Sequence, residues 1–198
     1  LLHELRYGIY NARGGLELLR SGEGYDFLLD AEVQDIPYAF RGRFEDSQLV
    51  AEGTYLETLY AEIDDPVELV LVTSDFPVPF PQVLSRLDLN LRGSKSREGP
   101  WRLWSEQSRI RNIPGQEGEN SLELTFRADE EEINLFDLRY VDQLSRIRGN
   151  GYFRLQAQGA AAELPIGADG WLQLAGEDSD ESYQLILSLE EEEVESDF

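Results

Sequence analysis

Apolar side chains at every second position are the feature of this sequence that most restricts its fold. Leu87, Leu89 and Leu91 alternate with polar residues, and four other segments show the same two-residue period. These segments are residues 25–33, 122–126, 153–157 and 183–189. Because successive side chains of a strand leave opposite faces of the sheet, each segment predicts a strand that is apolar on one side only. An antiparallel sheet with one wet face is therefore expected.

Short polar or glycine-rich stretches between these segments predict tight turns. They lie at residues 14–15, 22–24, 45–47, 64–66, 115–120 and 167–170. We expect about a dozen short strands joined in chain order as a meander. At most one short helix is expected, at residues 136–147, where Leu138, Val141, Leu144 and Ile147 recur every three residues.

A proline-rich stretch divides the sequence. Proline cannot donate to a strand ladder, so residues 76–84 predict a crossing, a bend or a sheet edge. An N-terminal sheet segment is expected at 1–75, a C-terminal one at 85–190, and an acidic tail at 191–198. The sequence begins at Leu1 and contains no methionine, so we expect a fragment of a longer chain. It lacks a run of about 20 apolar residues, so membrane contact is expected only through parts outside this fragment.

The formal net charge is −23, from 40 acidic and 17 basic side chains. Nucleic acids are bound largely through neutralisation of their phosphates by lysine and arginine, so we expect no nucleic-acid partner. Anionic lipid headgroups would be repelled as well. The chain contains no cysteine, which excludes a disulfide framework and a thiolate metal site.

Candidate catalytic and metal-binding residues are few. His3 lies close to the start of the sequence, where little would position it as a general base. The acidic pairs Asp30–Glu32 and Asp64–Asp65 are expected to be solvated, as is the acidic stretch 177–181, which resembles no calcium loop. We therefore predict no catalytic residue, no metal site, no cofactor and no enzymatic activity.

A local excess of basic residues surrounds Trp101 and Trp104. The cluster consists of Arg92, Lys95, Arg97, Arg102, Arg109 and Arg111. We interpret it as charged strand faces around core tryptophans. A contact with a lipid headgroup or a partner is the alternative, because mixed aromatic and basic surfaces can also stack on rings.

Two arrangements of the apolar side of the sheet are compatible with this pattern. It can meet a second sheet and become a sealed core, as in a closed β-sandwich that binds carbohydrate or protein near Trp101 and Trp104. It can instead curve and stay accessible as a groove that shields lipid methylenes from water, each worth about 0.8 kcal/mol. Periodicity alone favours the sealed core.

One family resemblance favours the open groove. Residues 121–159, SLELTFRADEEEINLFDLRYVDQLSRIRGNGYFRLQAQG, resemble the TamB-like translocation and assembly module proteins, which are relatives of the AsmA group. The shared pattern is an amphipathic strand, a leucine-rich segment and a glycine pair that opens the next strand, with Gly149, Gly151 and Gly159 at the glycine positions. Residues 67–93 are similar to that family's step through a proline-rich crossing into a strand that ends in Arg-Gly.

The resemblance implies a long, curved antiparallel sheet with an open apolar groove, the β-taco architecture. It also implies a periplasmic protein that is anchored in the inner membrane, outside this sequence. Such a protein would conduct phospholipid between the inner and outer membranes or support outer-membrane protein assembly, with a TamA-like, Omp85-type barrel as partner. Phospholipid acyl chains would contact the expected groove residues. These residues are Leu87, Leu89, Leu91, Leu122, Leu124, Phe126, Phe153, Leu155, Leu185 and Leu187.

Overall fold

In the residues that the computed structural model describes, all regular elements are β-strands. The structure describes residues 5–7, 10–80, 83–115, 118–156, 167–177 and 182–189. The strands are β1 Leu5–Tyr7, β2 Tyr10–Ser21, β3 Gly24–Val33, β4 Ile36–Glu45, β5 Gln48–Gly53, β6 Leu56–Glu62, β7 Val67–Thr73, β8 Phe76–Pro79, β9 Leu84–Asp88, β10 Asn90–Lys95, β11 Trp101–Arg111, β12 Ser121–Asp129, β13 Glu132–Val141, β14 Arg146–Gln156, β15 Gly167–Gly176 and β16 Ser182–Leu189.

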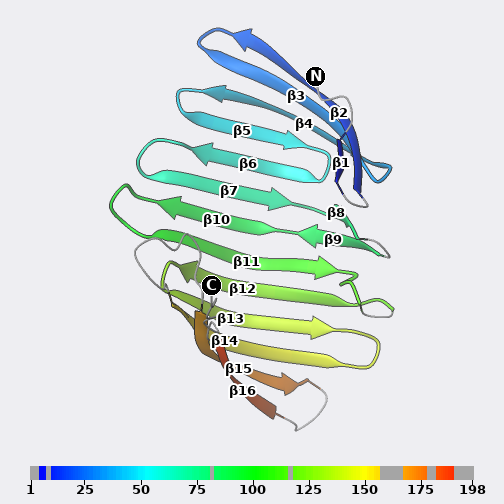
Figure 1. Cartoon of the computed structure of the whole chain (residues 1–198), viewed down its shortest axis with the longest axis vertical. Coiled ribbons are helices and arrows are strands. Elements are labelled where there is room, and N and C mark those ends of the chain that lie inside the picture. Colours follow the sequence, from blue (N-terminus) through cyan, green and yellow to red (C-terminus); the bar gives the residue numbers. More distant parts are fainter. Residues whose placement is uncertain are drawn as a thin grey trace, which may run out of the picture.

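These strands form one 16-stranded antiparallel sheet, stacked along the long axis of the molecule (Figure 1). Neighbours in the sheet follow the chain order except at the proline-rich stretch. There β7 pairs with β10, while β8 pairs only with β9 at one side of the sheet. The expected segments 1–75 and 85–190 therefore contribute to a single sheet. The closed two-sheet sandwich does not occur in the residues described above.

Strand register collects the alternating apolar residues on one face, here called the apolar face. One unbroken line of directly paired residues, the central row, crosses it from β2 to β16. The row consists of Leu18, Phe27, Gly42, Ala51, Leu59, Leu71, Leu91, Ser105, Phe126, Leu135, Gly151, Leu172 and Leu185. The opposite face carries most of the charged residues and is here called the polar face.

The sheet curves toward its apolar face. Side chains from every strand between β3 and β9 line one shared hollow on this face, which a flat sheet would not allow. Ala51 and Leu56 are buried there, although the described part of the chain contains no second layer above them. Glycine makes this crowding possible: a Cβ at Gly42 would collide with the Phe27 ring.

An aromatic cluster fixes the β8 end of this curve. Tyr38 and Phe40 of β4 contact Phe76 of β8, at ring-centroid distances of 5.4 and 6.5 Å. The short β5–β6 hairpin lies between these strands and contributes Tyr55 to the cluster. The Tyr38 hydroxyl donates a hydrogen bond of 2.6 Å to the backbone oxygen of the buried Pro77. The proline-rich stretch is thus joined to β4, a strand with which it does not pair in the sheet.

The helix expected at 136–147 is wrong. This stretch contains the end of β13 and the start of β14, joined by a turn in which the Asp142 carboxylate accepts the N–H groups of Leu144 and Ser145. The three-residue spacing does not reflect one helix face, because its members belong to different elements. Val141 ends β13, whereas Leu144 is a nearly fully exposed turn residue. The hydrogen bonds that the Asp142 carboxylate accepts from these backbone N–H groups stabilise the turn and help to lower the pKa of its carboxyl group.

Two of the expected turns are also wrong. Gly14 and Gly15 lie inside β2, and residues 167–170 begin β15. At both places glycine makes room across the sheet. A Cβ at Gly14 would meet the backbone of Ala31 on β3, and one at Gly170 would meet Phe153 on β14. Other turns agree with expectation, including Asp46-Ser47, where both residues have positive φ as in the usual two-residue hairpin turn.

We predict that Tyr38→Phe lowers the free energy of unfolding by about 1–3 kcal/mol, because it leaves the buried Pro77 oxygen without its donor. Urea denaturation measures this difference. Tyr25→Phe is the matched control: Tyr25 lies on the same face, is exposed, and should change stability by less than about 0.5 kcal/mol. Equal effects of the two substitutions would contradict the assigned role of the hydroxyl.

Candidate functional site: an open apolar face

The deepest part of the apolar face is a hollow of about 360 Å³ between β3 and β9. Apart from Thr73, all of its lining residues are apolar. They are Phe27, Leu29, Phe40, Ala51, Leu56, Leu59, Leu71, Thr73, Phe76, Leu87 and Leu89. The aromatic cluster bounds the hollow at the β8 end, where burial raises the pKa of Tyr38 and keeps its hydroxyl neutral. The hollow is open to solvent and presents hydrocarbon with no ionised group.

Three polar residues on the apolar face, Thr73, Ser105 and Ser108, have their hydroxyl groups engaged in local hydrogen bonds. Thr73 donates to the backbone oxygen of Leu87 and accepts from the N–H of Leu89. Ser105, which belongs to the central row, donates to the Ser108 hydroxyl at 2.6 Å, and Ser108 accepts from the N–H of Asn90. Since these hydroxyls already have partners, they interrupt the apolar character of the face very little.

The structure gathers most of the predicted groove residues on this one face. Leu87 and Leu89 line the hollow, and Leu91, Phe126 and Leu185 belong to the central row. The remaining described members also share the face, through direct pairing with apolar-face neighbours. They are Leu122, Leu124 and Phe153. Leu155 and Leu187 occupy strand positions of the same alternation, but their side chains lie outside the described part.

The prediction missed the N-terminal half of the face. Leu59, Leu71 and Phe76 line the hollow but were not among the expected groove residues. The reason is visible in β7, whose sequence VELVLVT is apolar on both faces, so that alternation does not single out Leu71. Pairing with Leu59 and Leu91 is what assigns Leu71 to the apolar face.

The polar face is held together by ion pairs between neighbouring strands. Arg41 of β4 pairs with Glu52 of β5 at 2.6 Å, and Arg111 of β11 pairs with Asp88 of β9 at 3.0 Å. At the margin of the apolar face, where Lys95 pairs directly with Trp101, Glu130 accepts from Lys95 and from the Trp101 N–H, which lowers the pKa of its carboxyl group. The β4–β5 and β9–β11 ion pairs keep the polar face hydrated and leave the apolar face as the surface that can take hydrocarbon.

The structure also places the residues considered for catalysis or metal binding. Glu32 forms an ion pair with Arg13, and Asp65 accepts the backbone N–H of Arg97. His3 and three acids of the 177–181 stretch lie outside the described residues. Within the described residues, no group of three or more His, Cys, Asp or Glu side chains is placed to hold a metal ion. The same residues contain no helix with the length and apolarity needed to cross a membrane.

Comparison with protein-family models, with curated proteins and with solved structures gave no match. The resemblance to the TamB-like proteins therefore stays a prediction. The single, curved, open antiparallel sheet is established by the structure itself.

Leu18 and Leu19 provide a matched test of which face takes hydrocarbon. They are neighbours in β2 with exposed fractions of 62% and 67%, but they point to opposite faces. We predict that Leu18→Glu weakens binding of the neutral solvatochromic dye Nile red about fourfold, the equivalent of one lost methylene contact. Leu19→Glu should leave binding unchanged. Equal losses in a fluorescence titration would show that the dye does not distinguish the faces.

Proposed function

We propose that the chain is a segment of a periplasmic TamB-like lipid bridge, whose apolar face carries phospholipid acyl chains between the inner and outer membranes. The observation that supports this most is the unbroken central row on an open face. A sealed core would bury such a row, whereas a hydrocarbon-binding surface needs it exposed.

The dimensions of the apolar face suit a moving acyl chain. The central row crosses 13 strands, and a spacing of about 4.8 Å between strands gives it a length of ~58 Å. An acyl chain covers about 15 Å, half of the ~30 Å hydrocarbon core of a bilayer. The row is therefore several acyl chains long, so a tail can shift along it and remain in contact with apolar side chains.

The uniform chemistry of the row favours movement over tight binding. Its members are leucine, phenylalanine, alanine and glycine, with Ser105 already hydrogen-bonded. A tail that moves from one strand to the next exchanges one set of apolar contacts for a similar one. In water the same tail would lose about 0.8 kcal/mol for each exposed methylene. A similar free energy at each position, well below that in water, is the condition for conduction without an energy source in this segment.

The polar face and the net charge of −23 support a groove in solution and not a surface that lies flat on a membrane. The headgroup of a carried lipid would stay in water beside the groove. The resemblance adds what the geometry leaves open: a role in outer-membrane protein assembly and a TamA-like outer-membrane barrel as partner. Both belong to the proposal.

A lipid-transfer assay tests the proposed function. We predict that the purified chain accelerates transfer of fluorescent phosphatidylethanolamine between phosphatidylcholine vesicles. Leu69→Glu should slow this transfer about tenfold, because a carboxylate in the path of the tail raises the barrier by more than ~1.4 kcal/mol. Leu69 lies on the apolar face, directly beside Ala61 and Gly93, and is 37% exposed.

Val50→Glu is the control for this experiment. Val50 is 49% exposed on the polar face, next to Arg43 and Tyr60, so its substitution should leave the transfer rate unchanged. Circular dichroism checks that both variants keep their strand content. A folded Leu69→Glu variant that transfers lipid at the wild-type rate would refute the proposed path.

A further inference from the structure

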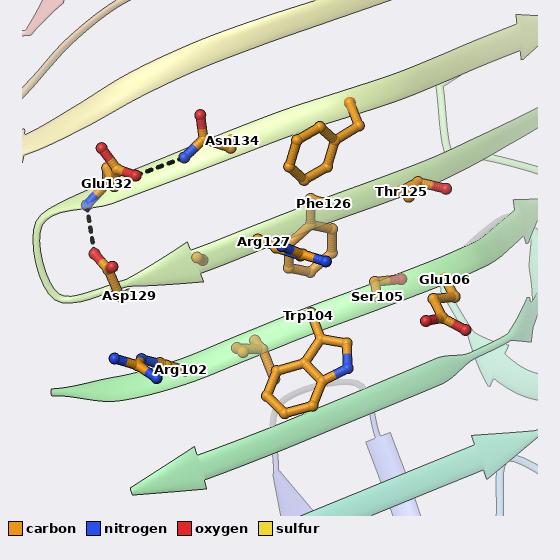
Figure 2. A pocket seen from close by; sticks show the side chains of 13 residues that line it. Arg102, Trp104, Ser105, Glu106, Thr125, Phe126, Arg127, Asp129, Glu132 and Asn134 are labelled. Atoms are coloured by element: carbon orange, nitrogen blue, oxygen red, sulfur yellow. Dashed lines mark hydrogen bonds between the residues drawn. The ribbon is translucent and has the colours of Figure 1, made fainter. Parts of the chain in front are cut away.

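The polar face contains a second concave feature, and most of its lining residues lie outside the proposed lipid path. It is a hollow of about 980 Å³ over β11, β12 and β13 (Figure 2). Trp104, Arg127 and Asn134 lie in direct register on these three strands and project into it. Its volume falls at the upper end of the range typical of small-ligand sites.

Two β-bulges create this hollow. One interrupts β11 between Ser105 and Ser108, and the other places Phe136 as an extra residue in β13. An extra residue bends its strand and redirects a side chain. Here it sends the Phe136 ring, 55% exposed, to the polar face, where the Arg127 guanidinium lies over it at 5.7 Å. Two aromatic residues, Trp104 and Phe136, therefore belong to a face that is otherwise rich in charge.

Trp101 and Trp104 were expected to lie together in one basic cluster, but the structure separates them. Trp101 and Trp104 are three residues apart in a regular part of β11, so they point to opposite faces. Trp104 instead lies directly between Arg92 of β10 and Arg127 of β12. Arg102, on the same face of β11, also lines the hollow.

Two arginine side chains line this hollow, and two of its three carboxylates, those of Asp129 and Glu132, already accept hydrogen bonds. In the described part of the chain, neither Arg102 nor Arg127 forms an ion pair with a carboxylate within 4.0 Å. Asp129 accepts the backbone N–H groups of Glu131 and Glu132, and Glu132 accepts from Asn134 and Tyr152. Guanidinium groups without a carboxylate partner match an anionic ligand, which they can bind by paired hydrogen bonds.

Acceptors for hydroxyl groups remain at the same place. Asn134 uses its amide nitrogen on Glu132, which leaves its amide oxygen able to accept. The exposed Glu106 lies at the end of the hollow away from the Asp129–Glu132 turn (Figure 2). Flat aromatic rings, cationic donors and hydroxyl acceptors together suit a sugar ring, whose C–H face packs on an aromatic side chain.

We propose that the hollow around Trp104 binds a hexose that carries an anionic group, a carboxylate or a phosphate. The sugar ring would pack against Trp104 and Phe136, and Arg102 and Arg127 would bind the anion. The side chains that would bind the sugar and its anion lie on the face opposite the central row, although Ser105 and Phe126 of that row also line the hollow. The headgroup of a lipid whose tails occupy the apolar face would therefore not reach them. The four proposed binding residues, Arg102, Trp104, Arg127 and Phe136, thus lie outside the lipid path.

Calorimetric titration of the folded chain tests this site with defined probes: trigalacturonate, glucose 6-phosphate and the neutral maltotriose. We expect at least one acidic probe to bind more tightly than maltotriose, and the stronger acidic probe identifies the preferred anion. The double substitution Arg102→Gln/Arg127→Gln should weaken that binding about tenfold or more, as expected for lost hydrogen bonds to a charged group. Phe136→Ala should weaken binding of the same probe, and the exposure of its ring makes the substitution safe for folding.

Arg109→Gln is the matched control. Arg109 lies on the same strand and the same face but is paired with Glu123 and outside the hollow, so its substitution should leave binding within about twofold. The proposal is overturned if no acidic probe binds at millimolar concentration, or if the double substitution binds an acidic probe as tightly as the wild type. It is equally overturned if maltotriose binds as well as both acidic probes. Lipid transfer should be unaffected by the double substitution, which separates this site from the proposed function.

Discussion

Cross-strand register is the constraint on which the rest of this structure depends. A single-layer sheet has no second layer to define its inside, so only the pairing of strands decides which side chains share a face. A slip of one residue in any strand would move its leucines to the polar face. The ladders place Leu59, Leu71 and Leu91 side by side, and the same row continues without a break to Leu185. The bulges in β11 and β13 preserve this alignment, because each adds one residue and leaves the apolar side chains before and after it on the same face.

Curvature turns this aligned face into a shielded surface. The small residues Gly42 and Ala51 are direct neighbours in the row and lie between the large Phe27 and Leu59. The Phe27 ring can therefore lean over Gly42. The hydrogen bond from the Tyr38 hydroxyl to the Pro77 oxygen and the stacking of Phe40 on Phe76 hold the curve near β8, where β7 pairs with β10 in place of the next strand in the chain. The face thereby gains partial burial without a covering layer from the part of the chain that the structure describes, which is the state that a hydrocarbon-binding groove requires.

The alternation of apolar residues was enough to predict the all-β architecture and the face shared by Leu87, Leu122 and Phe153. It did not predict whether that face would be open, because periodicity is the same for an open groove and a sealed core. It also failed where both faces of a strand are apolar, as around Leu71, and where glycines such as Gly14 serve packing across the sheet instead of a turn. The hollow at Trp104 depends on an extra residue in β13, which shifts Phe136 out of the simple two-residue pattern.

The central claim is that the apolar face takes hydrocarbon along its whole length. Because the sequence contains no cysteine, a nitroxide can be attached to one introduced cysteine at a time. The most direct measurement is electron paramagnetic resonance of labels along the central row, before and after addition of a long-chain fatty acid. Labels at positions 18, 59, 91, 126 and 185 should all move into an apolar environment, while labels at positions 19 and 50 of the polar face stay hydrated. A response confined to positions near the β3–β9 hollow would contradict the claim of a continuous path.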